Sequence, residues 1–419
     1  MKRNYRYDVV VVGGGIAGVA AAVGAAQAGA KTLLIERAGY LGGEATDAGI
    51  TAFCGIYASG SAGIKVVGGV CDQVLEQLAL LGQETCYEIS ASGNATVKFS
   101  PEYLKFALER AAEQVGVHLL YHCRMIDAFT EVDRVISIEC VDDTGRLEVQ
   151  AECFIDTTGD ANLAYLAGAS TIWGNGKGGA QTATLSIRLE HIGECKDISP
   201  EAIEKAILQA KADGMQNLTK EKGFIIRRGQ YDYGYCLLPS VVLENLNAET
   251  LTKAELDTRR QAHAYVEAFR RYMPGMENCS MTGTGPTIGI RESRKIEGRY
   301  TLSEKDVVDA VKRSDGVARG GWKPEIHRDP NKMGEYIPVE DGSYYDIPLS
   351  ALQSKSYSNL YGAGRIVSSD EIAFASARVM GTCFATGQAA GVAAAMQVRY
   401  GEVKIDVIRK ELLRQGAII

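Results

Sequence analysis

The sequence lacks the patterns that mark several common classes of protein. Its ten cysteines are spread over 419 residues without a Cys-x-x-Cys pair. No group of cysteines and histidines has the spacing of a zinc site, so we expect neither dithiol chemistry nor a metal centre. Free thiols are typical of a reducing compartment, which predicts a cytoplasmic protein.

Further absences limit the partners. Acidic residues outnumber basic ones by 52 to 45, so there is no basic excess of the kind that binds nucleic acid. The first residues, MKRNYRYD, contain no apolar core, and we expect no signal peptide. The least charged long run, residues 379–398, is rich in Gly, Ala, Thr and Gln and predicts a buried helix rather than a membrane span. We expect a small-molecule substrate, with no nucleic acid or membrane partner; the oligomeric state stays open.

Glycine, by contrast, is abundant, with 47 residues, and its first group lies in YDVVVVGGGIAGVAAAVGAAQAGAKTLLIER, residues 7–37. Residues 8–12 are mostly valine, as expected of a strand buried on both faces. Gly13, Gly15 and Gly18 follow with the spacing G-x-G-x-x-G. In such a loop the first glycine permits a tight turn, the second lets the backbone approach a pyrophosphate, and the third allows close helix packing.

The residues after this loop complete a dinucleotide-binding pattern. Residues 16–28 predict a helix, whose N-terminus at Ile16 and Ala17 would hold phosphates. A second strand is predicted over residues 31–35 and ends at Glu36, where an acidic side chain accepts hydrogen bonds from a ribose. The order of strand, turn, helix, strand and acid therefore predicts a dinucleotide site. Arg37 is either a contact in that site or a solvated charge at the strand end.

Later stretches carry a family resemblance. Leu41-Gly42-Gly43, with Thr46 beyond it, resembles the second glycine doublet of glutathione-reductase-like flavoproteins, which NAD dehydrogenases lack. FIDTTGDANLAYLAGA, TIGIRESRKIEGRYTLSEKDV and NLYGAGRIVSSDEIAFASARVMGTCFATGQAAGVAAA resemble, in order and texture, the FAD-dependent oxidoreductase family of that superfamily. The resemblance covers nearly the whole chain and is weakest over residues 171–277. It implies bound FAD and a Rossmann-like α/β fold with a parallel central sheet.

The resemblance also implies cofactor contacts in three loops and one helix. These are the doublet loop beside the ribityl chain, a second nucleotide-contacting turn, the turn that ends the last strand, and the final helix. In that order the residues are Gly42, Gly43 and Thr46; Thr158, Gly159 and Asp160; Gly364 and Arg365; and Gln388, Ala389 and Ala390. We expect further contacts from Glu44, Ala45, Arg124 and Met125.

Candidate catalytic residues follow from flavin chemistry, in which the cofactor carries electrons while the protein orients the substrate and moves a proton. Arg378 is a candidate for holding an anionic substrate or the flavin, because a guanidinium binds a carboxylate through two hydrogen bonds. Its alternative is a salt bridge with Asp370 or Glu371. Those two carboxylates stand, with Ser369, where the family often has Ala-Thr-His, so the imidazole of that motif is missing.

Two more candidates are less specific. Arg291 lies in a dense charge cluster with Glu292 and Arg294, for which an ion-pair network is the alternative. His327, one of only five histidines, is a candidate acid or base, and its alternative is a hydrogen-bonded structural role.

Tyrosine and cysteine give two further hypotheses. Tyr231, Tyr233 and Tyr235 alternate and share one strand face, which lines either a substrate pocket or a core. Cys54, which follows the flavin loop, is either an attachment point for the cofactor or a small buried residue.

We divide the chain into three segments. Residues 1–170 and 278–419 form the FAD-binding domain, and residues 171–277 an inserted α+β substrate or lid domain. The predicted reaction is hydride transfer between FAD and a small organic substrate. Two alternatives stay open: an NAD(P)H-using flavin reductase or monooxygenase-like enzyme, and a non-catalytic flavin-binding redox protein. The substrate, the direction of electron flow and the final acceptor do not follow from the sequence.

Overall fold

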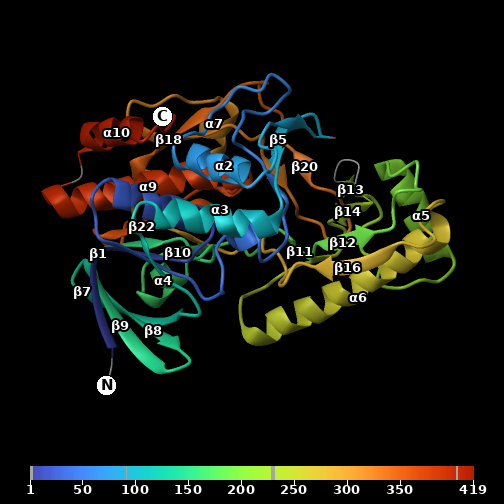
Figure 1. Ribbon diagram of the computed structural model, residues 1–419, viewed down its shortest axis with the longest axis horizontal. Helices are drawn as coiled ribbons and strands as arrows, with labels where there is room; N and C mark the ends of the chain where they lie inside the picture. Colours follow the sequence, from blue (N-terminus) through green and yellow to red (C-terminus); the bar gives the residue numbers. More distant parts are fainter. Residues whose placement is uncertain (1–2, 91, 228–231, 403) are drawn as a thin grey trace.

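A seven-stranded sheet forms the centre of the molecule, in the order β6-β2-β1-β9-β8-β7, with β22 also paired to β9 (Figure 1). The computed structural model describes residues 3–90, 92–227, 232–402 and 404–419. The strands are β1 (Arg3–Val12), β2 (Thr32–Ile35), β6 (His118–Leu120), β7 (Arg124–Glu131), β8 (Arg134–Asp142), β9 (Gly145–Asp156) and β22 (Leu360–Gly362). Strands β6, β2, β1, β9 and β22 are parallel, while β7 and β8 add an antiparallel hairpin. The predicted α/β class with a mostly parallel sheet is confirmed.

Alternating residues of β1 enter two cores on opposite faces of the sheet. Val9 and Val11 pack with the helices of one face, whereas Val10 and Val12 pack with the other. All four side chains are almost fully buried, as predicted from the valine run. Because β1 is parallel to β2 and β9, its carboxyl end and the glycines that follow lie at the same edge of the sheet as the carboxyl ends of those strands.

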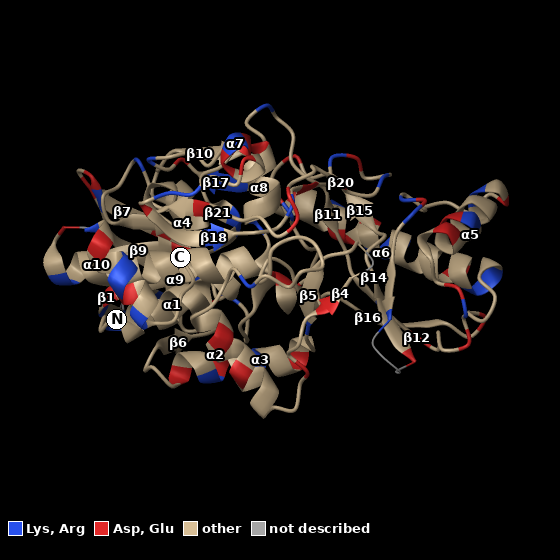
Figure 2. Ribbon diagram, turned by 90° about the horizontal axis from the view of Figure 1, so that it is seen from above, with Lys and Arg blue, Asp and Glu red and all other residues tan. Residues whose placement is uncertain are grey.

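Helix α1 (Ile16–Gln27) packs against α9 (Met380–Tyr400) through glycine and alanine. A Cβ on Gly387 would lie 2.2 Å from the carbonyl oxygen of Ala17, and one on Gly391 would lie 2.0 Å from that of Ala21. Charged side chains are sparse along both helices in Figure 2. Among the described residues no single helix is long and apolar enough to cross a membrane. Helices α8 (Glu371–Ala377) and α9 reach that length and apolar composition only together, as a pair bent by 92°.

Shorter elements surround this centre. The helices are α2 (Val70–Leu80), α3 (Pro101–Glu113), α4 (Asn162–Leu166), α7 (Glu304–Val308) and α10 (Ile405–Arg414), with single 3-10 turns η1 (Gly43–Ala45), η2 (Leu349–Ala351) and η3 (Gly364–Ile366). Small sheets are formed by β3 (Ala52–Phe53), β4 (Glu88–Ile89) and β5 (Ala95–Lys98); β10 (Thr171–Trp173) and β17 (Arg294–Ile296); β18 (Gly316–Gly320) and β21 (Tyr345–Pro348); and β19 (Glu325–Ile326) and β20 (Glu335–Tyr336).

A separate hydrophobic core joins residues between Ala183 and Ile288 and lies to the right of the main sheet in Figure 1. Its elements are β11 (Ala183–Thr184), β12 (Ile187–Glu190), α5 (Pro200–Ala212), β13 (Ile225–Arg227), β14 (Tyr233–Cys236), β15 (Ser240–Val241), α6 (Ala248–Tyr272) and β16 (Ser280–Thr284). This core supports our proposal of an inserted domain. The boundaries at residues 171 and 277 stay a prediction, because the core itself reaches Ile288.

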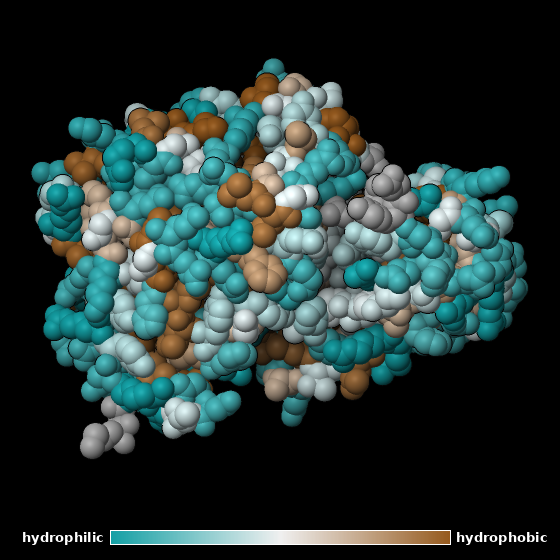
Figure 3. All heavy atoms as spheres, in the orientation of Figure 1, coloured by the Kyte–Doolittle hydropathy of each residue, from teal (hydrophilic) through white to brown (hydrophobic). Residues whose placement is uncertain are grey.

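The outer surface of the view in Figure 3 is mostly hydrophilic, and apolar side chains occur there in small groups. The exposed large apolar residues come from many elements, for example Leu80, Val132 and Leu256. Scattered apolar residues of this kind are ordinary for a protein surface. The described surface in this view therefore gives no large apolar docking face.

The α1–α9 contact generates a first prediction. Gly391→Ala should lower the free energy of unfolding by about 1–3 kcal/mol, because the added methyl group would overlap the backbone of α1. Alanine normally favours a helix over glycine by about 1 kcal/mol, so the expected sign is the reverse of the helix propensity. Chemical denaturation measures the difference. Gly283→Ala, where a Cβ meets nothing within 4 Å, is the matched control, and equal stability of the two variants would contradict the prediction.

Candidate active site

A single cavity of about 1210 Å³ extends from the carboxyl ends of the central strands to the second core. Ligands of open α/β sheets bind at this edge of the sheet. Its walls include the turns after β1, β2 and β9 and, on the far side, residues of the proposed inserted domain such as Lys220, Phe224 and Leu237. Typical pockets for small ligands have about 300–1,000 Å³, so this cavity has room for a dinucleotide together with a substrate.

The glycines after β1 have the geometry that a pyrophosphate requires. Gly13 has φ +102°, and a Cβ there would lie 2.6 Å from the carbonyl oxygen of Thr157. On Gly18 it would lie 1.8 Å from the oxygen of Gly13, which explains the close approach of helix and strand. Gly15 differs, because a Cβ there would meet nothing closer than 3.9 Å and would occupy the cavity. Gly15 also begins α1 without a side-chain cap, which leaves backbone N–H groups for an anion.

Glu36 is fixed on the cavity wall by the backbone. Its Oε2 accepts a hydrogen bond from Gly14 N–H at 2.6 Å, and its Oε1 accepts one from Ala38 N–H at 2.8 Å. Burial raises the pKa of Glu36, and these hydrogen bonds partly oppose the rise. Each carboxylate oxygen has a second lone pair, so the residue can still accept hydrogen bonds from ribose hydroxyls.

The second glycine doublet lies beside the first glycine loop. Gly42 N–H donates to the carbonyl oxygen of Gly14 at 2.9 Å, and Gly42 has φ +123°. Thr46 Oγ1 donates to the carbonyl oxygen of Leu41 at 2.9 Å, so this side chain stabilises the doublet loop itself. The two glycine loops, which α1 and β2 separate in the sequence, thus form one glycine-lined wall of the cavity.

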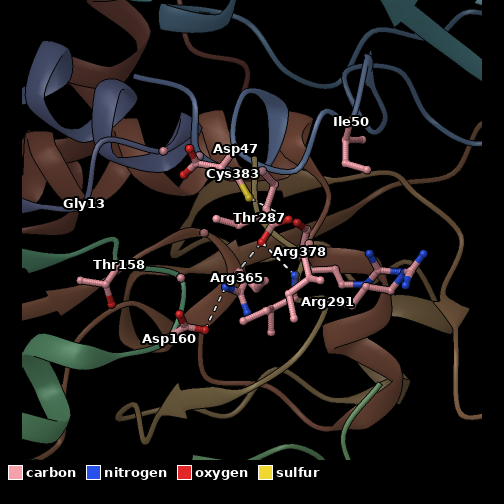
Figure 4. A pocket seen from close by; sticks show the side chains of 18 of the residues that line it. Gly13, Asp47, Ile50, Thr158, Asp160, Thr287, Arg291, Arg365, Arg378 and Cys383 are labelled. Carbon is pink, nitrogen blue, oxygen red and sulfur yellow. Dashed lines mark hydrogen bonds and ion pairs between the residues drawn. The ribbon is translucent and has the colours of Figure 1, made fainter. Parts of the chain in front are cut away.

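A buried ion pair connects the remaining predicted turns. Arg365 Nη2 lies 3.0 Å from Asp160 Oδ1, and Ser293 Oγ donates to the same oxygen at 2.6 Å (Figure 4). Glu44 Oε1 lies 3.7 Å from Arg365 Nη2. Burial by itself lowers the pKa of Arg365, but Asp160 and Glu44 outweigh it and raise the pKa. The carboxylates at this end of the cavity are therefore matched by a cation or by backbone N–H groups.

Most of the predicted cofactor contacts line the cavity, and six do not. Those on the wall are Gly13, Gly15, Ile16, Ala17, Glu36, Arg37, Gly42, Gly43, Glu44, Arg124, Met125, Thr158, Gly159, Asp160, Gly364 and Arg365. Gly18, Ala45, Thr46, Gln388, Ala389 and Ala390 lie behind it. Gln388 accepts from Val70 N–H at 3.1 Å and donates to Gln415 at 3.1 Å, and its two neighbours are fully buried. We therefore do not retain these six as direct cofactor contacts.

The three predicted catalytic residues meet at the far end of the cavity. Arg291 Nη1 donates to the carbonyl oxygen of Thr182 at 2.8 Å, and Arg378 Nη2 donates to the backbone oxygen of Glu325 at 3.0 Å. His327 Nε2 lies 3.2 Å from Glu325 Oε1. In Figure 4 the side chains of Arg291 and Arg378 lie side by side and point away from Thr158 and Asp160. We name Arg291, Glu325, His327 and Arg378 the far-end cluster.

The alternative roles of the two arginines are not found in the described part of the chain. Glu371 Oε1 pairs instead with Arg328 at 2.8 Å, and Asp370 caps α8 by accepting from Ala373 N–H at 2.8 Å. Glu292 pairs with Lys295 at 3.2 Å. Arg294 donates to Asn162 at 2.6 Å. Glu292 and Arg294 therefore have partners other than Arg291. Arg291 and Arg378 keep only backbone oxygens as partners within the described residues.

Burial and charge fix the protonation states of the far-end cluster. Burial, with Arg291 close by, lowers the pKa of His327 to about 3. Burial alone would raise the pKa of Glu325, but the hydrogen bond from His327 and the charges of His327, Arg378 and Arg291 lower it to about 2. The imidazole is therefore neutral, and its Nε2–H donates to the ionised Glu325. The other nitrogen, Nδ1, is buried without a hydrogen-bond partner among the described residues and has a free lone pair.

Lys220 belongs to this end of the cavity, and the sequence analysis missed it. Its side chain is 4% exposed and lines the cavity. Burial and the charge of Arg291 lower its pKa to about 7. The local sequence, Thr219-Lys-Glu-Lys222, has the composition of an ordinary charged surface loop, so no signal in it marks Lys220 as buried.

Two other sequence hypotheses can now be placed. Cys54 is half-buried and lines the cavity, and desolvation raises the pKa of its thiol to about 12, which favours a neutral thiol over an attachment point. Tyr233 and Tyr235 form a ring contact with centroids 6.2 Å apart and are not on the cavity wall. Tyr231 lies outside the described residues.

The sequence profile described as "FAD dependent oxidoreductase" matches residues 8–414 of the chain. The chain belongs to the FAD-dependent oxidoreductase family. It is an enzyme with FAD as cofactor, and the glycine loops, Glu36 and the vacant side of Gly15 are a suitable cradle for that group. The match supports the family and does not place the chain in the glutathione-reductase-like group. No curated protein matches it.

Solved structures with a similar fold cover nearly the whole of this FAD-dependent oxidoreductase. BexE, studied for oxidation during BE-7585A biosynthesis, has 12% identity and a TM-score of 0.50 over 98% of this chain and 66% of its own. A geranylgeranyl bacteriochlorophyll reductase-like protein from Thermoplasma acidophilum has 13% identity and a TM-score of 0.46 over 99% and 85%. The flavin-dependent brominase Bmp2 has 14% identity and a TM-score of 0.48 over 98% of this chain and 84% of its own. At such identities the comparison concerns the fold alone.

The open side of Gly15 leads to a second prediction. Gly15→Ala should weaken FAD binding about tenfold or more, because its methyl group would occupy the cavity. The stability of the FAD-free protein should stay within about 0.5 kcal/mol of the unmodified chain. Flavin fluorescence quenching measures the first quantity and denaturation the second. Unchanged FAD affinity, with Gly283→Ala as control, would contradict the assignment of the glycine loop.

The lowered pKa of Lys220 gives a third prediction, which concerns pH. Between about pH 7 and its ordinary pKa of 10.5, the unfolded chain binds a proton at this residue that the folded chain does not. Stability from this group therefore rises with pH across that window. Lys220→Met should make the FAD-free protein more stable than the unmodified chain at pH 7, and the difference should shrink towards pH 10. A difference that is constant with pH would show that Lys220 is not buried as described.

Proposed function

We propose that this enzyme transfers a hydride between bound FAD and a small organic substrate. The observation that carries the proposal is the single cavity that joins the glycine loops to the far-end cluster of Arg291, Glu325, His327 and Arg378. A substrate held at the cluster would share one cavity with the cofactor. The cluster offers cations that bind and a nitrogen lone pair that accepts a proton, which are the protein groups that such a reaction needs.

The residues that would hold FAD lie along the sheet edge. Backbone N–H groups at Gly15 and the start of α1 would bind the pyrophosphate, and Glu36 would bind the ribose. The loops at Gly42–Gly43 and Gly364–Arg365 would lie along the rest of the cofactor. When bound, FAD supplies the centre that accepts or donates the hydride.

His327 is the residue that we propose to move the proton. Removal of a hydride from a C–H bond next to an O–H or N–H leaves a proton on that oxygen or nitrogen, and the free lone pair of Nδ1 can accept it. Glu325 would stabilise the resulting imidazolium through the Nε2–H contact of 3.2 Å. In the opposite direction the same nitrogen would return the proton.

The charge of the arginines controls how strongly His327 attracts a proton. Arg291 and Arg378 both lower the pKa of His327, so the imidazole in the empty cavity is a weak base. A negatively charged group bound between the arginines would cancel part of their field and raise the basicity of Nδ1. Proton transfer would therefore become favourable mainly when the site is filled.

The test is anaerobic reduction of the bound flavin. The FAD-loaded protein is mixed with a set of small alcohols, amines and organic acids, and in parallel with NADPH alone, while the absorbance of oxidised flavin is followed. Bleaching by an organic compound, with a matching oxidised product, is the expected result. Rapid bleaching by NADPH alone would favour the reductase or monooxygenase-like alternative. A stable flavin that no compound reduces would favour the non-catalytic one.

The role of His327 gives a fourth prediction. His327→Gln should lower the rate constant of flavin reduction about 100-fold or more, because an amide cannot accept the proton at neutral pH. FAD affinity should be unchanged, since His327 lies at the end of the cavity away from the glycine loops. His263→Gln, on the exposed side of α6, is the matched control. A variant at position 327 with a normal rate constant would assign the proton transfer to another group.

A further inference from the structure

Three cations line the far end of the cavity, namely buried Lys220 and partly buried Arg291 and Arg378, and Glu325 is the carboxylate whose charge they share. Arg291, Arg378 and Lys220 all line it, and none forms an ion pair with another part of the described chain. Arg378 Nε is also buried without a hydrogen-bond partner in the described structure. A partly buried charge without an ion pair costs free energy, so an arrangement that keeps such charges facing a cavity points to an anionic ligand.

At the opposite end of the cavity the acidic side chains have partners within the protein. There Glu36 accepts two backbone N–H groups, and Asp160 pairs with Arg365 at 3.0 Å. The phosphates of FAD would lie at this end, beside Gly13 and Gly15. They are therefore not the anion that Arg291 and Arg378 face, since these side chains point away from Thr158 and Asp160 in Figure 4.

Formal charge decides which anion fits best. Arg291 and Arg378 contribute two positive charges, Glu325 contributes one negative charge, and His327 is neutral. With Lys220 neutral, the far-end cluster thus carries one net positive charge, which a single carboxylate neutralises. Guanidinium groups also match the planar shape of a carboxylate and bind it through paired hydrogen bonds.

The cavity also has apolar side chains on its wall. Phe224, Ile226, Leu237 and Met333 line it, from the proposed inserted domain and from the loop before β20. Such a wall binds a hydrocarbon or aromatic body and leaves a single charged group for the arginines.

We infer that the substrate of the proposed reaction is an organic acid with an apolar body, and that its carboxylate is bound by Arg291 and Arg378. This inference rests on the proposed function only in calling the bound acid a substrate. The binding site itself does not depend on turnover, and it can be tested without any reaction. Lys220 lies close enough to Arg291 for the two charges to interact, and it adds a third cation to the subsite when it is protonated.

The probe for this site is benzoate, compared with benzamide, which has the same size and no charge. The FAD-loaded protein is titrated with each compound while the visible flavin spectrum and the intrinsic fluorescence are recorded. Benzoate should bind at least ten times more tightly than benzamide. Arg291→Lys and Arg378→Lys should each weaken benzoate binding about tenfold or more, because lysine keeps the charge but loses the paired hydrogen bonds. FAD affinity should change less than twofold in both variants.

Arg328→Lys is the matched control, because this neighbouring arginine is exposed and pairs with Glu371. It should bind benzoate as the unmodified protein does.

Equal affinity for benzoate and benzamide, or no response to benzoate in protein that holds FAD, would overturn the inference. Tighter binding of phenyl phosphate than of benzoate would overturn the choice of a carboxylate. Loss of FAD from the lysine variants would assign the arginines to the cofactor instead. Benzoate binding without flavin reduction by any compound would leave this inference standing and count against the hydride-transfer proposal alone.

Discussion

The close contact between α1 and α9 is the constraint on which the geometry of the cavity depends. Glycines at positions 387 and 391 let the two helix backbones touch, and no larger residue fits there. Helix α1 begins at the glycine loop, whereas α9 begins at Met380, two residues after Arg378. Their contact therefore sets the relation between the cofactor end of the cavity and the far-end cluster. Thr386 of α9 strengthens this relation by accepting the N–H of Gly364 at 3.2 Å.

The two ends of the cavity differ in how their polar groups are satisfied. At the cofactor end, backbone N–H groups and Arg365 match the acidic side chains, so the wall is complete before any ligand binds. At the far end, His327 Nδ1 and Arg378 Nε have no partners in the described residues. Polar atoms that a fold leaves unsatisfied lower its stability, and they commonly mark the place where a ligand completes the network. The contrast indicates a pre-formed cofactor wall next to a site that a ligand must complete.

The proposed inserted domain contributes one side of the cavity. Lys220, Phe224, Ile226 and Leu237 come from it. The edge of the central sheet thus carries the glycine loops, while this domain lines the other side of the same cavity. A fold similarity at 12% identity gives no substrate. For this reason the charges and apolar side chains of this chain itself carry the argument on the substrate.

The sequence by itself determined the sheet edge, the glycine loop and Glu36. These features lie within one strand-turn-helix-strand unit, so their spacing along the chain also sets their spacing in the fold. The sequence also singled out Arg291, His327 and Arg378 by residue type. It could not show that they meet, because β-strand pairing and the α1–α9 contact join segments far apart in the chain.

Only the tertiary structure decided the roles that depend on burial and direction. Lys220 reads as a surface residue in its local sequence, and its lowered pKa arises from the side chains that surround it in the fold. Gln388, Ala389 and Ala390 lie on the correct helix, but that helix turns them towards α1, α2 and the C-terminal segment instead of the cavity. Thr46 supports its loop from behind through its bond to Leu41. A helix or loop can be predicted from local sequence, but the direction of each side chain depends on which neighbours pack against it.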